Sequence, residues 1–328
     1  MKSNRLLILI VLLLITFVAV YIFSNPHGTL KSGNTGFLIQ SADKISEIKI
    51  SSSQEQIGLS KKNNTWELNG KYKVNDLIIT NFLNALTSID ILTPVSKVER
   101  NQISNILKKE GVLVELRDNK FFSRKFFVNQ PAMSKNKTYM MMTNSQEPYI
   151  VRIPDFKGQV SQLFITNENF WRDKTVFNYL PQHIKSITVE YPRSNTKSFK
   201  VAYNKGTFTL QNLNEGEYEQ DFNIEKVAQY FTNFQNVKYE NKATLAGEKI
   251  DSVKQSVAYC IISVEDYNGA INKLEIFRKD AENNIDEFGN KAGFDYNRAY
   301  AVFNNNDELL VIQYYNFDLI FKEIDYFR

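Results

Sequence analysis

The hydrophobic positions form one long run at the N-terminus and shorter periodic runs after it. From Leu6 to Phe23, only Thr16 interrupts a series of aliphatic and aromatic residues. As a helix this run would be about 27 Å long, close to the ~30 Å hydrocarbon thickness of a bilayer. Lys2 and Arg5 precede the run, and no basic residue follows before Lys31, so the positive-inside rule places the N-terminus in the cytoplasm.

We therefore expect residues 1–5 to be cytoplasmic, residues 6–23 to form a single-pass signal anchor, and the rest of the chain to be exported. Frequent Lys, Asn and Ile suggest a bacterial protein, which makes the expected location the inner membrane, with the C-terminal domains in the periplasm. A cleaved signal peptide is the alternative. It would have a shorter apolar core and a small-x-small cleavage site, and residues 20–26 contain no such site.

Beyond the anchor, the hydrophobic pattern occurs twice. Residues 24–36 are rich in Gly, Pro and small polar residues and predict a flexible tether. Two similar stretches follow, residues 37–170 and residues 184–328, with residues 171–183 as a connector. The repeat is clearest at a constant offset of 148, which relates an amphipathic helix after Asn75 to one after Asn223 and a strand from Val112 to one from Cys260.

The order of elements within each copy indicates an α+β fold. Short alternating runs typical of strands precede and follow the predicted helix, and each copy ends in a helical pattern, Phe156 to Phe164 in the first and Phe317 to Phe327 in the second. An antiparallel sheet with one face buried under helices accounts for this order. We expect two tandem homologous domains, each an antiparallel sheet covered by helices.

Four segments carry a family resemblance. They are an Ile-x-x-Ile-x-Ile strand, the stretch from Leu59 to Leu68, the Asn75-Asp76 helix start, and Trp171-Arg-Asp-Lys174 before the second copy. Together they resemble an uncharacterised bacterial family of exported domains, a domain of unknown function. The resemblance implies a membrane-anchored protein, and some members of that family accompany ABC-type gliding-motility transport systems. The family supplies no catalytic or binding residues.

Composition narrows the classes of function. The net charge of +4 over 328 residues is small, and no clustered basic face is evident, so we expect no nucleic-acid partner. Cys260 is the single cysteine and alternates with apolar residues, so it is predicted to lie in the core. The chain contains no Gly-x-Ser-x-Gly, Walker-type or Gly-x-Gly-x-x-Gly motif, and we expect neither a cofactor nor catalytic residues.

One loop of the second copy has spacing that suits a metal. Oxygen-bearing side chains occupy alternate positions at Asp280, Glu282, Asn284 and Asp286, as in a calcium-binding loop. Ile285 stands where such a loop needs Gly, and the residue expected to close the shell is a lysine. The segment is therefore a weak calcium candidate, with a solvated polar loop as the alternative.

The corresponding hairpins of the two copies carry opposite charge. Residues 113–137 contain six basic and two acidic side chains, whereas residues 261–291 contain four basic and seven acidic ones. Exposed charge of one sign attracts an oppositely charged partner or lipid surface. The candidate contacts for lipid or a partner are Arg117, Lys120, Arg124 and Lys125, and ordinary variation of surface charge is the alternative.

The anchor, the repeat and the missing catalytic motifs favour a non-enzymatic interaction or accessory protein. Its expected partners are the inner membrane, through Leu6 to Phe23, and a membrane protein such as a transporter subunit of a transport or envelope assembly. A periplasmic module that binds glycan, peptide or metal is the alternative, and a concave polar pocket would favour it. An enzyme whose site assembles from distant residues is a third hypothesis.

Overall fold

The structure is a computed structural model that describes residues 13–16, 35–118, 123–281 and 293–328. The chain divides into two compact units, unit 1 (Met1–Arg172) and unit 2 (Asp173–Arg328). Of the predicted anchor, residues 13–16 are helical and the remainder lies outside the described residues. None of the described helices combines the length and apolarity that a bilayer crossing requires.

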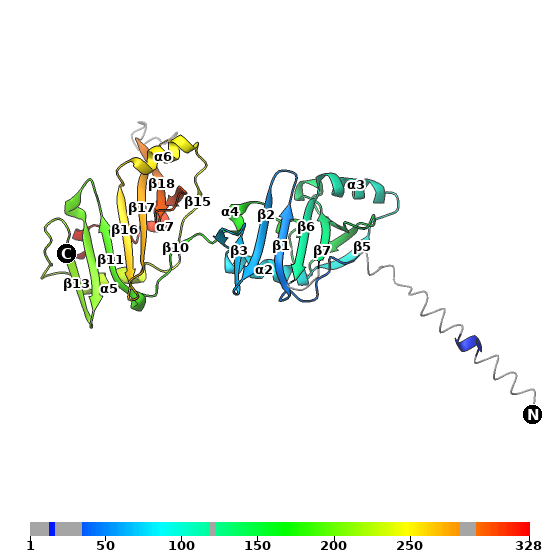
Figure 1. Ribbon diagram of the computed structural model, residues 1–328, viewed down its shortest axis with the longest axis horizontal. Helices are drawn as coiled ribbons and strands as arrows, with labels where there is room; N and C mark the ends of the chain where they lie inside the picture. The colour runs from blue at the N-terminus through cyan, green and yellow to red at the C-terminus, as the bar shows by residue number, and fades with distance from the viewer. Residues whose placement is uncertain (1–12, 17–34, 119–122, 282–292) are drawn as a thin grey trace, which may run out of the picture. The chain divides into compact units, whose positions relative to one another are not determined.

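Unit 1 is built on one antiparallel sheet in the order β4-β3-β2-β1-β6-β7-β8-β9-β5. Neighbours in this order are joined mainly by tight hairpins, and the central pair β1 and β6 brings together strands distant in sequence (Figure 1). The strands are β1 (Ile45–Ser51), β2 (Gln56–Lys62), β3 (Thr65–Leu68), β4 (Tyr72–Lys73), β5 (Asp90–Pro94), β6 (Val112–Asp118), β7 (Ser123–Val128), β8 (Thr138–Met142) and β9 (Tyr149–Arg152).

One face of this sheet is buried under α2 (Asp76–Thr87), η2 (Val160–Leu163) and α4 (Glu168–Trp171). The Asn75 side chain accepts hydrogen bonds from the first free amides of α2, which confirms the predicted helix start. Trp171 is fully buried, with its ring 5.0 Å from that of Phe82. Helix α3 (Arg100–Glu110) lies next to β7 and β8.

Unit 2 has a second antiparallel sheet in the order β13-β12-β11-β16-β17-β18-β19-β15. A separate two-stranded pairing joins β10 to β14. The strands are β10 (Thr175–Phe177), β11 (Ile184–Glu190), β12 (Phe199–Asn204), β13 (Thr207–Asn212), β14 (Val237–Lys238), β15 (Asn241–Lys242), β16 (Cys260–Asp266), β17 (Ile271–Asp280), β18 (Phe294–Phe303) and β19 (Leu310–Gln313).

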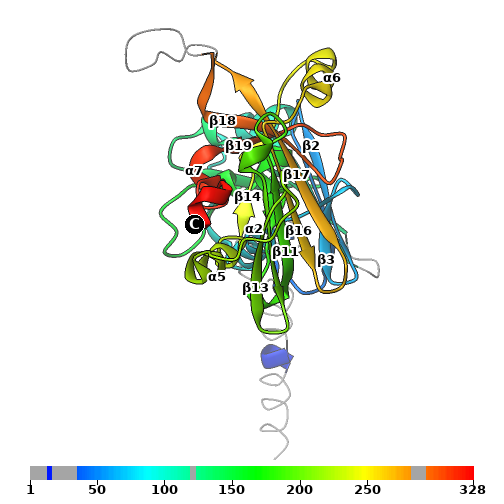
Figure 2. The same cartoon turned by 90° about the vertical axis from the view of Figure 1, so that its left-hand side faces the viewer.

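Both faces of the second sheet are covered in part. The larger core lies under α5 (Ile224–Thr232), α7 (Tyr314–Phe317) and η5 (Ile324–Phe327), and Figure 2 shows α5 and α7 on the side away from α6 (Gly247–Gln255). A smaller cluster that includes Phe277, Tyr300 and Val302 packs with apolar residues of α6. The remaining short helices are η1 (Pro131–Met133), η3 (Pro181–His183) and η4 (Asn195–Lys197).

The two sheets share a strand order and a local irregularity. Eight strands of each sheet follow one another in the same spatial order. In unit 2 the order is β13, β12, β11, β16, β17, β18, β19 and β15, and in unit 1 the equivalent strands are β3, β2, β1, β6, β7, β8, β9 and β5. The pairing of β1 with β6 shifts register after Ile45, and that of β11 with β16 shifts after Ile184. A β-bulge changes the direction of the side chains next to it, so its presence at the same place in both central strand pairs is a specific similarity between the two sheets.

The α+β class predicted from the sequence is therefore confirmed, and several details differ. The helix expected over Phe156 to Phe164 is reduced to η2, and the chain takes a turn with positive φ at Asp155 before it. The one expected over Phe317 to Phe327 is also interrupted: residues 318–323 form a turn and an irregular segment between α7 and η5. Apolar spacing predicted the buried side chains there better than the backbone conformation.

The predicted connector, residues 171–183, is divided between the units. Trp171 belongs to the core of unit 1, whereas β10 pairs with β14 inside unit 2. Its apolar side chains explain this division, since Trp171, Val176 and Phe177 are buried. The last residues of the expected tether also have a structural contact, because the Arg124 guanidinium donates a hydrogen bond to the carbonyl of Gly36.

Candidate functional site

A hollow of about 490 Å³ lies at one end of the sheet of unit 2, and we call it hollow 2. The turn after β11, the residues before β16, the last residues of β17 and the segment before η5 form its walls. Its lining combines aromatic and charged side chains: Tyr191, Arg193, Lys197, Val257, Tyr259, Arg278, Asp280, Phe294 and Glu323. Such a mixture of flat apolar surface and a few charged groups is typical of small-ligand sites.

Arg278 is an exposed cation of hollow 2 that packs against two aromatic rings. Its guanidinium carbon lies 4.2 Å from the ring centroid of Phe294 and 4.6 Å from that of Tyr259. Both rings present their faces to a cation, so they restrict the orientation of the side chain. No carboxylate of the described residues forms an ion pair with Arg278. The in-plane N–H groups of a guanidinium in this position suit an oxyanion.

The other charges of hollow 2 nearly balance. Lys197 donates to a carboxylate oxygen of Glu323 at 2.6 Å, and this hydrogen bond raises the pKa of the lysine. The remaining charged residues of the lining are two cations, Arg193 and Arg278, and one carboxylate, Asp280. The described lining of hollow 2 therefore carries a small net positive charge at neutral pH.

The floor of hollow 2 is closed by Tyr191, which is 4% exposed. Its hydroxyl donates to the Lys322 carbonyl at 2.8 Å, and its ring lies edge-on to that of Tyr259. Burial raises the pKa of Tyr191 and also that of the Cys260 thiol beside it. Cys260 thus occupies the core position that the sequence predicted, and a thiol kept protonated and buried is a poor nucleophile.

Unit 1 has a hollow at the corresponding end of its own sheet, which we call hollow 1, of about 370 Å³. Ser52 follows β1 as Tyr191 follows β11, because Ser51 pairs with Leu113 and Glu190 with Ile261. Gln54 and Arg193 each stand two residues further along, in connections of different length, residues 52–55 and residues 191–198. The lining of hollow 1 is neutral and polar at these places, with Ser52, Gln54 and Gln130.

The position of Arg278 is occupied by Gln130 in unit 1. In unit 1 Val128 pairs with Val112, and Gln130 follows Val128 by two residues. In unit 2 Ile276 pairs with Cys260, and Arg278 follows Ile276 by two residues. Gly111 precedes β6 where Tyr259 precedes β16, and a Cβ at Gly111 would lie 2.3 Å from the Leu107 carbonyl oxygen. An aromatic side chain is therefore excluded from this wall of hollow 1 by the end of α3.

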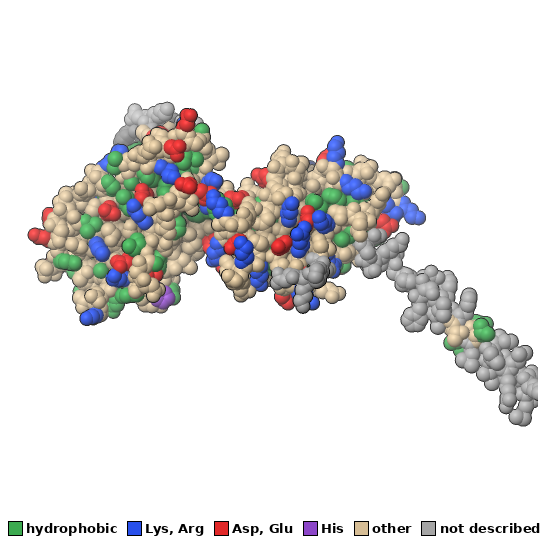
Figure 3. Space-filling model, in the orientation of Figure 1, with side chains coloured by type: hydrophobic (Ala, Val, Ile, Leu, Met, Phe, Trp, Pro, Cys, Tyr) green, Lys and Arg blue, Asp and Glu red, His purple; other side chains and the backbone are tan. Residues whose placement is uncertain are grey.

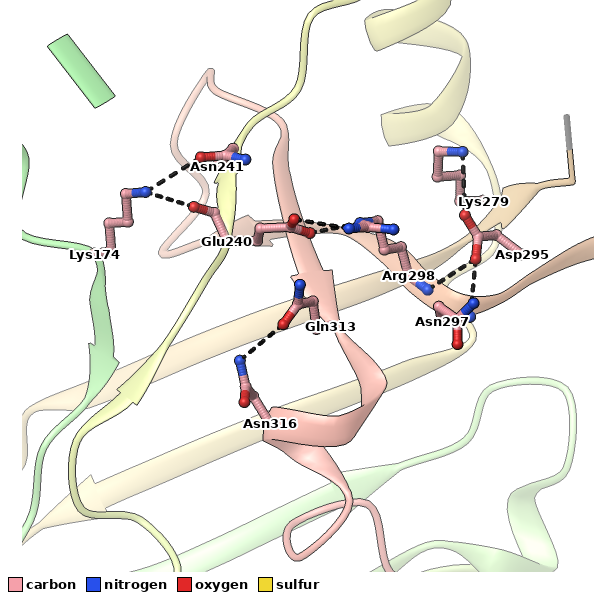
Figure 4. Close-up of polar contacts among 9 residues, drawn as sticks. All are labelled: Lys174, Glu240, Asn241, Lys279, Asp295, Asn297, Arg298, Gln313 and Asn316. Atoms are coloured by element: carbon pink, nitrogen blue, oxygen red, sulfur yellow. Dashed lines mark hydrogen bonds and ion pairs between the residues drawn. The ribbon is translucent and has the colours of Figure 1, made fainter. Parts of the chain in front are cut away.

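A second polar cluster of unit 2 joins residues of β17 and β18 to the residues just before β10 and β15 (Figure 4). Arg298 makes two hydrogen bonds to the Glu240 carboxylate, at 2.6 and 2.9 Å, and Lys174 donates to the Glu240 carbonyl. The Asp295 carboxylate forms an ion pair with Lys279 at 3.3 Å. These groups satisfy one another, so the cluster serves the structure of unit 2 and offers no open coordination for a ligand.

The calcium candidate falls mainly on residues that the structure does not describe. Glu282, Asn284 and Asp286 lie outside the described residues, and Asp280 ends β17 on the wall of hollow 2. Across residues 13–16, 35–118, 123–281 and 293–328, no group of three or more His, Cys, Asp or Glu side chains could hold a metal ion. The calcium site stays a prediction.

The basic hairpin of unit 1 has two kinds of cation. Arg117 and Lys125 are exposed and flank Glu115, with Lys125 at 2.8 Å from its carboxylate and Arg117 at 3.8 Å. Figure 3 shows basic and acidic side chains interspersed on this face. Arg124 turns inward and donates to the carbonyls of Gly36 and Leu38, and burial lowers its pKa. Lys120 lies outside the described residues.

The sequence did not single out Tyr191, Arg193, Tyr259, Arg278 and Phe294 as a group. They come from four separate segments, and Arg278 entered the sequence argument only as one charge among many. A residue-by-residue comparison of the two copies would have found the signal, because Ser52, Gly111 and Gln130 in the first correspond to aromatic or cationic residues in the second.

Comparison with known proteins gives a family match. The model of the family described as domain of unknown function (DUF4340) matches residues 66–256, which extend from β3 in unit 1 to the end of α6 in unit 2. No curated protein and no solved structure matches the chain.

Proposed function

Because the chain belongs to the DUF4340 family, whose function is unknown, we propose its role from its own residues: an exported, membrane-anchored interaction protein that holds a partner at unit 2. The observation that carries this proposal is the recurrence of a hollow at the same end of both sheets. The described lining of hollow 1 is mainly polar, with Glu55 as its charged residue, whereas that of hollow 2 includes three basic side chains and the rings of Tyr259 and Phe294. A retained concavity with changed chemistry is what a duplicated binding module would have.

We infer that units 1 and 2 arose by duplication of one domain. The shared strand order and the shared bulge at Ile45 and Ile184 support this inference. So does the equal offset between the helix caps Asn75 and Asn223 and between the strands that begin at Val112 and Cys260. Duplication frees one copy to change its surface while the other preserves the packing.

The proposed location rests on the sequence. An apolar run from Leu6 to Phe23 with basic residues only on its N-terminal side is typical of a signal anchor. The resemblance to a family of which some members accompany gliding-motility transporters makes a subunit of a transport or envelope assembly the first partner class to test. The partner would meet unit 2 in the periplasm.

Site-specific photo-crosslinking in the native host tests the proposal. A photoreactive residue replaces Val257 on the rim of hollow 2, where it is 55% exposed, and the control replaces Val98 in unit 1, which is 93% exposed. We expect a defined membrane-fraction adduct from position 257 and none from position 98. Equal adducts from both positions, or none from 257, would contradict the proposal, as would recovery of the full-length protein in the soluble fraction.

A ligand-binding module is the second candidate, and one observation favours it. Hollow 2 holds a guanidinium against two aromatic rings, with no ion-pair partner in the part of the chain that the structure describes. A surface used only for broad protein contact would not need a cation oriented in this way. The two candidates are compatible if the bound group belongs to a peptide segment of the partner.

A further inference from the structure

We infer that hollow 2 binds a peptide carboxylate, with Arg278 as the principal contact and Arg193 as a second cation. The inference rests on the proposed function, because it names the chemistry by which a partner segment would be recognised. It is carried by the two arginines, by the rings that hold one of them, and by the different lining of hollow 1.

Arg278 is organised for an oxyanion before any ligand arrives. Contacts of 4.2 and 4.6 Å to the rings of Phe294 and Tyr259 restrict a side chain that would otherwise lose considerable entropy on binding. The ring contacts leave the edge of the guanidinium, which carries its N–H donors, as the part able to bind a ligand. Two parallel N–H donors match the two oxygens of a carboxylate.

The charge of hollow 2 favours a monoanion. The ion pair of Lys197 with Glu323 leaves Arg193 and Arg278 opposed by Asp280, which lines the same hollow. A carboxylate would complete the balance of charge, whereas a dianionic phosphate would leave excess negative charge beside Asp280. Charge complementarity of this kind sets specificity more than total affinity.

The size and apolar surface of hollow 2 indicate a peptide rather than a free small acid. Its volume of about 490 Å³ falls within the usual range of ligand sites, about 300 to 1,000 Å³, and far exceeds one carboxylate group. Val257 and the rings of Tyr259 and Phe294 offer apolar surface for a neighbouring side chain. An apolar residue next to the carboxylate would use this surface.

Saturation-transfer difference NMR on the full-length chain in detergent tests the inference. The probes are acetyl-Ala-Ala-Leu with a free C-terminal carboxylate, the same peptide as its C-terminal amide, and acetyl-Ala-Glu-Leu amide, whose carboxylate is on a side chain. We expect saturation transfer to one or both carboxylate peptides and none to the neutral amide. The comparison of the two carboxylate peptides distinguishes a chain terminus from an acidic side chain.

The matched variants replace each arginine with glutamine, the residue that unit 1 carries at the place of Arg278. Arg278→Gln should weaken binding by about tenfold or more, since a hydrogen bond between charged groups is replaced by a neutral one. Arg193→Gln should have a smaller effect. Gln130→Ala and Gln54→Ala in hollow 1 are the controls and should leave binding unchanged, and far-ultraviolet circular dichroism checks that every variant is folded.

Equal signals from the neutral and carboxylate peptides would overturn the inference, as would unchanged binding by folded Arg278→Gln. Absence of binding by any peptide would overturn it as well. The proposed function is tested separately, because a crosslink from position 257 in cells does not depend on these probes. A crosslink without peptide binding would therefore contradict the inference of a peptide carboxylate ligand but would still support the proposed role as an interaction protein.

Discussion

Arg278 in unit 2 and Gln130 in unit 1 occupy the same register position, each two residues beyond a strand residue paired across the sheet, Ile276 with Cys260 and Val128 with Val112. The backbone frame around them is similar, and the side chains differ in charge and reach. Hollow 1 thus provides an internal reference for hollow 2, since a common structural requirement would favour similar side chains in both.

The thiol of Cys260 should report on the floor of hollow 2. It is the chain's single cysteine, is fully buried, and lies in hydrogen-bonding contact with Tyr191. We expect almost no labelling by a maleimide reagent in the folded protein and complete labelling in denaturant. Tyr191→Ser, which introduces the residue found in unit 1, should accelerate labelling, whereas exposed Tyr315→Ser should not. Rapid labelling of the folded wild type would contradict the burial of Cys260.

The C-terminus should be essential to the core of unit 2. Phe327 is fully buried, with its ring 4.8 Å from that of Phe199, and its carbonyl accepts a hydrogen bond from the amide of Asn223 at the start of α5. Phe327→Ala should lower the free energy of unfolding of unit 2 by about 3–5 kcal/mol. Urea denaturation measures this loss.

The control for this substitution is Tyr315→Ala. Tyr315 is 90% exposed, so its removal should change the free energy of unfolding by no more than about 0.5 kcal/mol. Similar losses for Phe327→Ala and Tyr315→Ala would mean that the terminal helix η5 does not complete the core.

The ion pair of Glu240 with Arg298 should make unit 2 sensitive to acid. Hydrogen bonds from Arg298 lower the pKa of Glu240 from its ordinary value of 4.5. The unfolded chain therefore binds this proton more readily, so the stabilisation is present above the ordinary pKa and is lost as the pH falls through the folded-state pKa. Glu240→Gln should be less stable than wild type at neutral pH, and the difference should shrink towards about pH 3.

Thermal unfolding followed across this pH range measures the effect. Asp221→Asn is the matched control, because Asp221 is an exposed carboxylate of the same unit and forms no ion pair with the described residues. A stability difference between wild type and Glu240→Gln that stays constant with pH would contradict the linkage.

The basic hairpin of unit 1 can be tested for contact with anionic lipid through its exposed cations. Arg117→Glu with Lys125→Glu should reduce binding to anionic vesicles at low salt while preserving the fold, since both side chains are exposed. Arg124→Glu is unsuitable, because it would remove the donor to the carbonyls of Gly36 and Leu38 and place a carboxylate beside them. Unchanged vesicle binding by the folded double variant would count against a lipid contact.

Periodicity in the sequence was sufficient to predict the elements that bury apolar side chains. The caps at Asn75 and Asn223, the strands beginning at Val112 and Cys260, and the core place of Cys260 all follow from local spacing. The helices α3 and α6 were not predicted. Each buries little apolar surface: Leu107 is the apolar residue of α3 that is buried, and no residue of α6 is.

Hollow 2 could not be predicted from local patterns, because its walls come from segments that meet only in the folded sheet. Tyr191 and Arg278 are 87 residues apart in the sequence and share the hollow through the pairing of β11, β16 and β17. The register of those strands, and not any motif, places the two side chains together. The constant offset of 148 relates Gln130 to Arg278, but the sequence alone did not show that Arg278 and Tyr191 line one hollow.

Hydrogen–deuterium exchange of the full-length protein in native membranes, compared with the purified protein in detergent, tests most directly whether hollow 2 is the surface in use. We predict slower exchange in membranes for peptides that cover residues 191–198 and 256–260, with no change for residues 52–55 and 111–113 of hollow 1. Equal protection of both sets, or protection of the hollow 1 peptides alone, would contradict the assignment of partner binding to unit 2.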